Sequence, residues 1–225
     1  MADIRTEVKT IGVIGGTGKE GKGLAYRWAK AGYRVLIGSR NIEKAQAAVD
    51  EIRVRLAASA MVEARINADA VRESDLAVLT VPYAAQADTL TALKDLLQGK
   101  ILIATTVPLV PPKVTRVQLP AAGSATLEAQ QILGEGTPVV AAFQNISYEK
   151  LLTDQPMECD VLVCGTGKAA RETALKLVED AGLIGWDGGP LENSVVVEGM
   201  TSILIGLNKQ HGVQSAGIKI TGIQR

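Results

Sequence analysis

The chain has 225 residues, of which 47% are hydrophobic, 21% charged and 3% aromatic, and its 24 Lys and Arg balance 24 Asp and Glu. A chain of this size can bury one good-sized core, or one domain with a smaller partner packed on it. The balanced charge and the scarcity of aromatic rings give no reason to expect nucleic acid or an anionic membrane as a partner.

Short apolar runs alternate with amphipathic stretches through the first two-thirds of the chain. The helices are expected at residues 21–31, 42–56 and 84–97, and the strands at residues 10–14, 33–37, 62–66, 75–81, 100–104 and 139–143. Strands that are apolar throughout and separated by helices predict a parallel sheet covered on both faces. The right-handed crossover rule then predicts an α/β fold with a Rossmann-type doubly wound parallel sheet.

The pattern changes after the last of these strands. Residues 108–120 are rich in proline and apolar side chains and are expected to leave the sheet as an irregular loop. The remaining chain holds one further strand, one helix and a long apolar segment at residues 195–207. We therefore expect a Rossmann domain at residues 1–146 and a second, smaller C-terminal domain at residues 147–225.

A glycine-rich turn follows the first expected strand. It contains the motif G-x-G-x-x-G at Gly16, Gly18 and Gly21, and it opens an amphipathic helix, which is the context of a dinucleotide-binding turn. Gly16 permits the tight turn, Gly18 lets the backbone approach a pyrophosphate, and Gly21 lets the helix pack closely on the strand. The free N–H groups of the helix N-terminus attract the phosphates. The turn lacks the Gly-Lys-Ser/Thr ending of a Walker loop, which argues against an ATPase.

The end of the second expected strand distinguishes NADP from NAD. Proteins that bind NAD usually place Asp or Glu there, about 20 residues on, to bind the ribose 2′-OH. This chain instead reads Gly38-Ser39-Arg40-Asn41, with Lys44 one turn further on. A carboxylate would repel a 2′-phosphate, whereas a hydroxyl, a guanidinium and an ammonium bind it. Because cations at a helix N-terminus oppose the helix dipole unless an anion is present, the pattern predicts NADP.

These motifs, with several later ones, resemble the NADPH-dependent reductases of coenzyme F420, a family that exchanges hydride between NADP and this deazaflavin. The resemblance covers nearly the whole chain and is carried by residues 15–18, 21–25, 38–40, 79–83, 106–109, 159–165, 189–193 and 216–219. Family members often carry His at the position of Gln144 and Pro at that of Ser202. Both departures lie toward the second substrate rather than the NADP site.

The resemblance implies which residues contact the cofactors. It implies that residues at the glycine turn and the second strand end bind the NADP phosphates and ribose, and that residues 143–146 lie where the deazaflavin meets the nicotinamide. It also implies that the helix of Leu207 helps to close that pocket, and that the protein is a homodimer. The expected cofactor-binding residues are Gly16, Thr17, Gly18, Lys19, Glu20, Gly21, Ser39, Arg40, Lys44, Pro82, Tyr83, Val107, Gln144, Ile146 and Leu207.

Few side chains could act as a general acid or base, and this shortage favours a hydride transfer between two cofactors. A dehydrogenase of alcohols or carbonyls moves a proton with the hydride, but His211 is the only histidine, and Tyr83 and Tyr148 have no Lys in a Y-x-x-x-K pattern. Hydride exchange between two cofactor rings needs the protein mainly to stack them and exclude water. We therefore assign no catalytic side chain. Two alternatives stay open: an NADPH-dependent reductase of another small acceptor (a carbonyl, an imine or a metal-bound group), and an NADPH sensor without turnover.

The positions of the two cysteines bear on disulfide formation and metal binding, and the first residues of the chain bear on the location of the protein in the cell. Cys159 and Cys164 fall on one expected strand at odd spacing, so their side chains are expected on opposite faces, without a disulfide. No metal site is expected, because neither cysteine has a neighbouring ligand pair. Residues 1–10 lack the apolar core of a signal peptide, and no apolar run is long enough to span a bilayer. We expect a cytoplasmic protein without membrane contact.

Overall fold

A computed structural model describes residues 7–57 and 59–223 of the chain, so residues 1–6 of the start considered above lie outside the described part. Within it the strands are β1 (Thr10–Ile14), β2 (Arg34–Ser39), β3 (Val62–Ile66), β4 (Leu76–Leu79), β5 (Leu102–Ala104), β6 (Val139–Ala141), β7 (Asp160–Gly165) and β8 (Ile184–Gly189). The α-helices are α1 (Lys19–Lys30), α2 (Ile42–Arg53), α3 (Asn67–Arg72), α4 (Gln86–Leu97), α5 (Ala125–Leu133), α6 (Lys168–Asp180) and α7 (Ser194–His211), and short 3-10 turns are η1 (Tyr83–Ala85), η2 (Tyr148–Lys150) and η3 (Leu191–Asn193).

The strands form one sheet in the order β3-β2-β1-β4-β5-β6-β7-β8. The first six run parallel, as predicted, and the strand order is that of a doubly wound Rossmann sheet. β7 runs antiparallel to β6, and β8 runs parallel to β7. The C-terminal chain therefore extends the same sheet, and the division into two domains at residue 146 stays a prediction.

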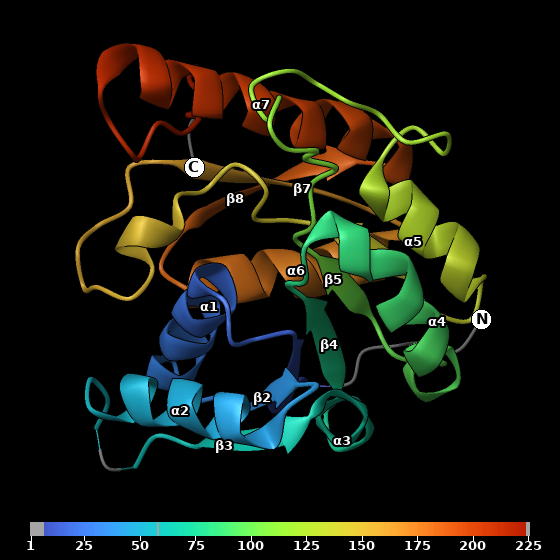
Figure 1. Cartoon of the computed structure of the whole chain (residues 1–225), viewed down its shortest axis with the longest axis vertical. Helices are drawn as coiled ribbons and strands as arrows, with labels where there is room; N and C mark the ends of the chain where they lie inside the picture. Colours follow the sequence, from blue (N-terminus) through green and yellow to red (C-terminus); the bar gives the residue numbers. More distant parts are fainter. Residues whose placement is uncertain (1–6, 58, 224–225) are drawn as a thin grey trace.

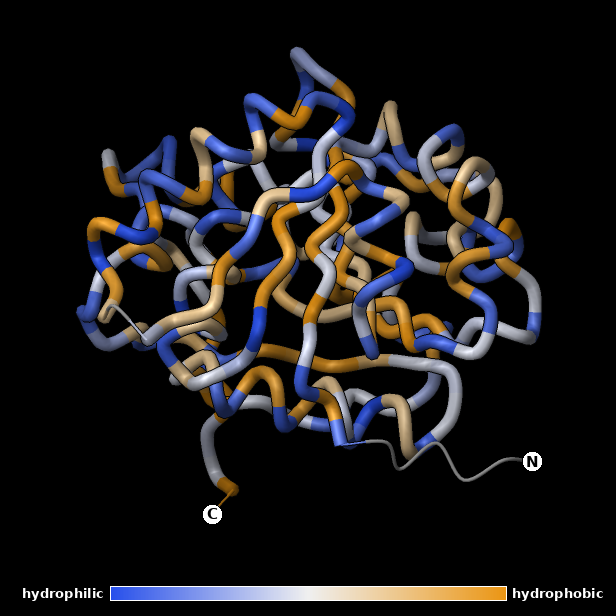
Figure 2. Tube along the Cα trace, turned by 90° about the horizontal axis from the view of Figure 1, so that it is seen from below, coloured by the Kyte–Doolittle hydropathy of each residue, from blue (hydrophilic) through white to orange (hydrophobic). Residues whose placement is uncertain are grey.

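Helices cover both faces of the sheet because the strands are apolar on both sides. One face packs against α1, α2 and α6, and the other against α3, α4, α5 and α7. Figure 1 shows α7 lying across the sheet near β7 and β8, at the end away from β2 and β3. Figure 2 shows hydrophobic residues concentrated in the central strands. Burial of these side chains stabilises the fold by roughly 25 cal/mol for each Å² of apolar surface removed from water.

A buried tryptophan joins the two parts of the chain. The Trp28 ring of α1 contacts Phe143 edge to face, with 5.8 Å between ring centroids, and its Nε1–H donates to the carbonyl of Leu177 in α6 at 2.8 Å. Both aromatic side chains are almost fully buried. Because the indole N–H is paired, this large side chain is buried without leaving a polar group unsatisfied.

The two cysteines lie on opposite faces of the sheet, as expected. Both thiols are free and buried, Cys159 in the core beside α1 and α6 and Cys164 in the cluster under α7.

Among residues 7–57 and 59–223, none of the helices is both long and apolar enough to cross a membrane.

Candidate functional site

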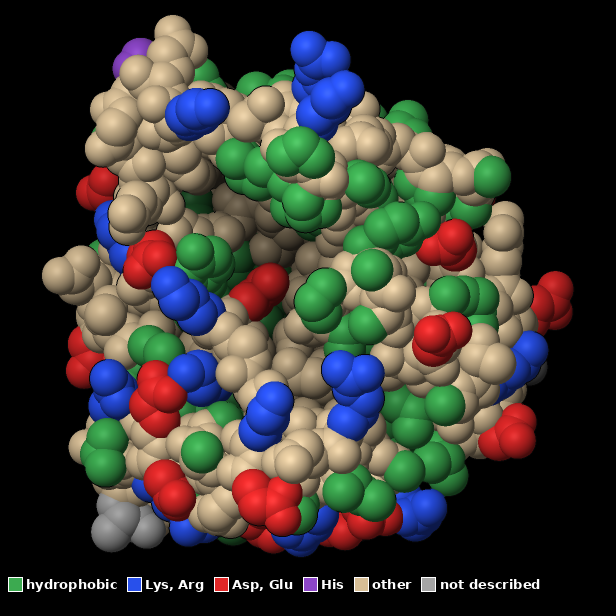
Figure 3. All heavy atoms as spheres, viewed as in Figure 1, with side chains coloured by type: hydrophobic (Ala, Val, Ile, Leu, Met, Phe, Trp, Pro, Cys, Tyr) green, Lys and Arg blue, Asp and Glu red, His purple; other side chains and the backbone are tan. Residues whose placement is uncertain are grey.

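A cleft of about 1150 Å³ opens at the carboxyl ends of β1, β4, β5 and β6. It is lined by the glycine turn, by the segments that follow β4, β5 and β6, by one side of α7, and by the chain after α7. Figure 3 shows a hollow on this face of the molecule, below α7. In open parallel sheets this end is where ligands bind, because the strand order reverses there and the loops separate.

The glycine turn is held in place by its neighbours. The N–H of Gly16 donates to the carbonyl of Gly38 at 2.9 Å, and the N–H of Gly15 donates to Oδ1 of Asn67 at 3.2 Å. A Cβ at Gly21 would lie 2.7 Å from Cα of Gly16, so α1 can approach the turn this closely only with glycine there. A Cβ at Gly18 would meet nothing within 4 Å. The close helix and the open space above its N-terminus fit a bound pyrophosphate.

A second pocket of about 270 Å³ adjoins the cleft at the end of β2. Its lining includes Ser39, Arg40 and Lys44, together with Thr17 and Pro82, which also line the large cleft. No ion pair involves Arg40 or Lys44 among the described residues. Two uncompensated cations at the start of α2 thus lie beside the glycine turn, in the position predicted for a 2′-phosphate.

The turn after β6 contributes polar groups from the opposite side of the cleft. Gln144 and Asn145 are buried, and their carbonyl oxygens Oε1 and Oδ1 have no hydrogen-bond partner within the described chain. The amide of Gln144 donates to Ala104 O at 2.7 Å, and that of Asn145 donates to Val197 O at 2.8 Å. Phe143 has a φ of 75°, a strained value for a bulky residue. Unpaired buried acceptors on a strained turn are typical of a binding site.

The margin of the cleft is closed by a contact between the glycine turn and η2. The ammonium of Lys19 lies 3.4 Å from a carboxylate oxygen of Glu149 and 4.8 Å from the centre of the Tyr148 ring. All three side chains line the cleft. Tyr83 also lines the cleft, and burial and the nearby Glu128 carboxylate raise the pKa of its phenol. The phenol is therefore neutral and does not serve as a base at neutral pH.

Glu20 lies deeper in the cleft, in the first turn of α1. Burial raises the pKa of its carboxyl to about 7, and the nearby hydroxyl of Thr105 opposes part of this rise. Thr105 is itself buried and follows β5. Its hydroxyl donates to the Leu79 carbonyl at 3.2 Å.

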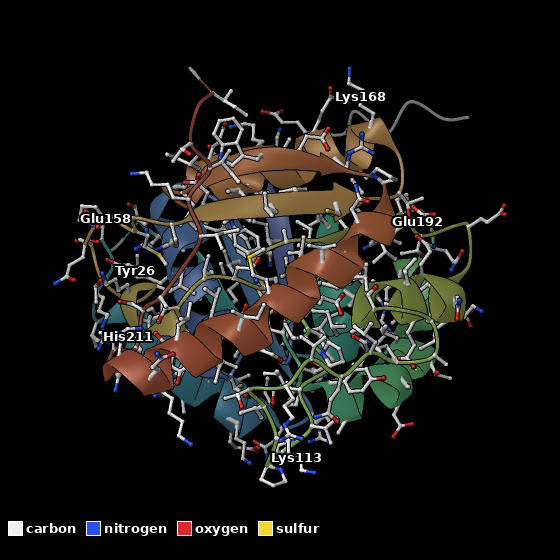
Figure 4. The ribbon with its side chains drawn as sticks, turned by 90° about the horizontal axis from the view of Figure 1, so that it is seen from above. Tyr26, Lys113, Glu158, Lys168, Glu192 and His211 are labelled. Atoms are coloured by element: carbon white, nitrogen blue, oxygen red, sulfur yellow. The ribbon has the colours of Figure 1, made fainter. Side chains whose placement is uncertain are left out.

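The helix α7 contributes other residues than the one expected. Leu207 is 39% exposed on the outer face of α7, whereas the cleft is lined from this helix by Thr201, Leu204, Ile205 and Asn208. Those four positions repeat at the helical spacing i, i+3, i+4, i+7, so they share a face from which residue 207 is turned by about 100°. The structure therefore brings Leu204, not Leu207, to the cleft. Figure 4 shows His211 at the C-terminal end of α7, and this residue is exposed.

Most of the other expected residues line the two pockets, and their contacts with cofactors stay a prediction. Thr17, Lys19, Glu20, Pro82, Tyr83, Val107, Gln144 and Ile146 all line the large cleft. Sequence reasoning placed Asn145 at the site only as part of residues 143–146, and it missed Thr105 and the segment after α7, of which Val213, Gln214 and Ala216 line the cleft. For Thr105 the available signal was its position, since it is a polar residue directly after an apolar strand.

The sheet order, the glycine turn at α1 and the cationic pocket after β2 define a Rossmann-type dinucleotide-binding protein. Residues 10–108 match the family described as NADP oxidoreductase, coenzyme F420-dependent. The chain is 41% identical to the F420-dependent NADP reductase of Methanothermobacter thermautotrophicus over 98% of both chains. It is 38% identical to that of Methanocaldococcus jannaschii, over 95% of this chain and 99% of the relative. The chain belongs to the family of F420-dependent NADP reductases.

A solved structure of the same fold comes from Arthrobacter sp. FB24 and is described as a putative F420-dependent NADP-reductase. It superposes with a TM-score of 0.80 and 24% identity, over 96% of this chain and all of that one. The similarity supports the Rossmann-like fold over nearly the full length, including the C-terminal strands.

Proposed function

We propose that this chain is an oxidoreductase that transfers a hydride between NADP(H) and the deazaflavin coenzyme F420. The observation that carries the proposal is the continuity of the site: a cationic pocket, the glycine turn and a turn with unpaired acceptors lie along one cleft. The identity of about two residues in five with F420-dependent NADP reductases, over nearly the full length, supports the same activity.

The pocket after β2 supports NADP rather than NAD. Arg40 and Lys44 would bind the 2′-phosphate as uncompensated cations, with the hydroxyl of Ser39 as a further donor. The backbone N–H groups at Thr17 and Gly18 would bind the pyrophosphate at the N-terminus of α1. Nothing within 4 Å of a Cβ at Gly18 obstructs a ligand there.

The far half of the cleft supports a second ring system. Single small ligands usually occupy pockets of about 300–1000 Å³, and this cleft has about 1150 Å³ without the pocket after β2. Gln144, Asn145 and Ile146 line this half of the cleft, so the turn after β6 would face the rings of the bound cofactors. When both cofactors are bound, their rings supply the hydride chemistry, and the chain orients them and excludes water.

Mixing the purified protein with NADPH and F420 tests this function. We expect the visible absorbance of the deazaflavin to disappear in proportion to NADPH oxidised. Oxidation of NADPH with another acceptor but not with F420 would favour a reductase of a different substrate. Binding of NADPH without oxidation by any acceptor would favour a sensor.

We further infer that the chain forms a homodimer through α7. Val196, Ile203 and Leu207 are 61%, 57% and 39% exposed, and their spacing of seven and four residues puts them on one face of the helix. Figure 4 shows α7 on the outside of the molecule. A continuous apolar stripe on a surface helix is typical of a protein interface, and a second copy would bury it.

A further inference from the structure

Lys19 is the first residue of α1 and carries a cation at a helix N-terminus, where the helix dipole disfavours positive charge. Its ammonium lies 3.4 Å from a carboxylate oxygen of Glu149 and 4.8 Å from the centre of the Tyr148 ring. In the described part of the chain, the one ion pair of Lys19 is with Glu149. The Glu149 carboxylate thus compensates the charge of Lys19 in the protein without a ligand.

The pyrophosphate of a bound dinucleotide is a second anionic partner for the same ammonium. The glycine turn directly precedes Lys19, and a Cβ at Gly18 would meet nothing within 4 Å, which leaves open space for phosphates at the N-terminus of α1. Gly18, Lys19 and Glu149 all line one cleft. The Lys19 side chain is 66% exposed and its four-carbon stem is flexible, so the ammonium can turn from the carboxylate to a phosphate without disturbing buried packing.

The carboxylate of Glu149 is held at the margin of the cleft, because η2 packs firmly on α1. Arg27 of α1 donates hydrogen bonds to the carbonyls of Lys150 and Leu151, each at 3.0 Å. Gly23 of the same helix lets Leu151 pack directly against it, since a Cβ at residue 23 would overlap the Leu151 side chain. The backbone of η2 is therefore fixed on α1, and the exposed ammonium is the part of the ion pair that changes partner.

We propose that Glu149 lowers the affinity of the site for NADP(H) by competing with the pyrophosphate of the cofactor for the ammonium of Lys19. The inference rests on the proposed binding of NADP(H) at the glycine turn. Binding breaks the pair between Lys19 and Glu149 before the ammonium contacts phosphate, and the loss of that pair weakens the net affinity. An exposed ion pair changes an equilibrium by up to about fivefold. Glu149 therefore adjusts the affinity for the cofactor and does not prevent its binding.

Dissociation constants of NADP⁺, measured by calorimetry without F420, test the proposal in a double-mutant cycle. We expect Glu149→Gln to bind NADP⁺ about two- to fivefold more tightly than the wild type at low salt, and the gain to shrink at about 0.5 M NaCl. Lys19→Met should bind NADP⁺ less tightly than the wild type. In the Lys19→Met background, Glu149→Gln should change the Kd by less than about 1.5-fold, because the cation for which Glu149 competes is gone.

A smaller ligand and a matched variant serve as controls. The single phosphate of 2′-AMP would occupy the pocket after β2, so 2′-AMP should bind the wild type and Glu149→Gln within about 1.5-fold of each other. Glu172→Gln breaks an exposed Lys–Glu pair of α6 outside both pockets and should leave the Kd of NADP⁺ unchanged.

The outcomes separate this inference from the proposed function. Unchanged or weaker NADP⁺ binding in Glu149→Gln would overturn the inference and leave the proposed function intact. An equal gain for 2′-AMP, or an equal gain in the Lys19→Met background, would show that Glu149 acts without Lys19 and the pyrophosphate, and would overturn it as well. Failure of the wild type to bind NADP⁺ would overturn both the inference and the proposed function.

Discussion

Glu198 of α7 accepts both hydrogen-bond donors of Thr126 in α5, the backbone N–H at 2.9 Å and the hydroxyl at 2.5 Å. The same carboxylate accepts the N–H of Ala125 at 2.7 Å, so it satisfies the first free donors of α5 from another helix. The side chain is fully buried. This contact fastens α7 to the N-terminus of α5 and thereby positions the helix face that lines the cleft.

Replacing Glu198 tests that contact. Glu198→Ala leaves two buried N–H groups and a hydroxyl without an acceptor, and we expect the free energy of unfolding to fall by about 2–4 kcal/mol. Urea denaturation monitored by circular dichroism measures this change. The control is Glu192→Ala, an exposed residue of η3 just before α7, which should change stability by less than about 0.5 kcal/mol. Equal stability of the two variants would contradict the role of Glu198.

The glycine turn offers a pair of variants that separate binding from packing. A Cβ at Gly18 enters open space, so Gly18→Ala should keep Tm within about 2 °C while weakening NADP binding about tenfold or more. A Cβ at Gly21 meets Gly16 at 2.7 Å, so Gly21→Ala should lower stability by about 1–3 kcal/mol and binding as well. Thermal unfolding and cofactor titration check both variants. Normal NADP affinity in Gly18→Ala would show that the phosphates do not approach this residue.

Arg40 should discriminate between the two dinucleotides. Arg40→Ala removes a charge-assisted contact with the 2′-phosphate, and we expect NADP affinity to fall about 10- to 100-fold with little change for NAD. Titrations with both cofactors measure this difference. Arg55→Ala removes an exposed arginine outside both pockets and serves as the control for net charge. Equal losses for NADP and NAD in Arg40→Ala would show that Arg40 does not read the 2′-phosphate.

The ion pair between Arg34 and Glu63, at the β3 edge of the sheet, should make the stability of the fold depend on pH in the acid range. The Arg34 guanidinium, which hydrogen-bonds Glu63 at 2.7 Å, lowers the pKa of that carboxyl to about 2. A lowered pKa means that the folded chain favours the carboxylate, so this stabilisation is present above the unfolded pKa near 4.5 and is lost as the pH falls toward 2. At pH 7 we expect the free energy of unfolding of Glu63→Gln to be about 1–2 kcal/mol lower than that of the wild type. The difference should shrink in urea titrations below pH 4.5; a constant difference would contradict the pairing.

The proposed dimer can be tested on the outer face of α7. Ile203→Glu places a charge in the centre of the apolar stripe, and we expect the dimer to dissociate into folded monomers. Light scattering after size-exclusion chromatography measures the mass. Val54→Glu, at an apolar residue that is 80% exposed after α2, should leave the mass unchanged. A monomeric wild type would exclude the dimer, and an unchanged dimer in Ile203→Glu would place the interface elsewhere.

Local patterns in the sequence predicted most of the sheet and many of the residues that line the cleft. Apolar runs bounded by glycine and proline located six parallel strands, although β4 ends at Leu79 rather than at residue 81 and β5 begins at Leu102 rather than at residue 100. The short helices α3 and α5 were missed, because six and nine residues carry little periodic signal. The residues expected around the pyrophosphate and the 2′-phosphate were predictable from local patterns. The glycine turn follows β1 directly, and Arg40 and Lys44 come just after β2.

By itself, the sequence determined the Rossmann topology of the first six strands, the glycine turn and the cations after β2. Each of these depends on residues that are neighbours along the chain, so turn chemistry and hydrophobic period suffice. Only the tertiary structure decided that β7 reverses direction, that Leu204 rather than Leu207 faces the cleft, and that Glu20 and Thr105 line the same cleft. Those relationships join residues far apart in sequence, and they follow from how helices dock on the sheet rather than from any local pattern.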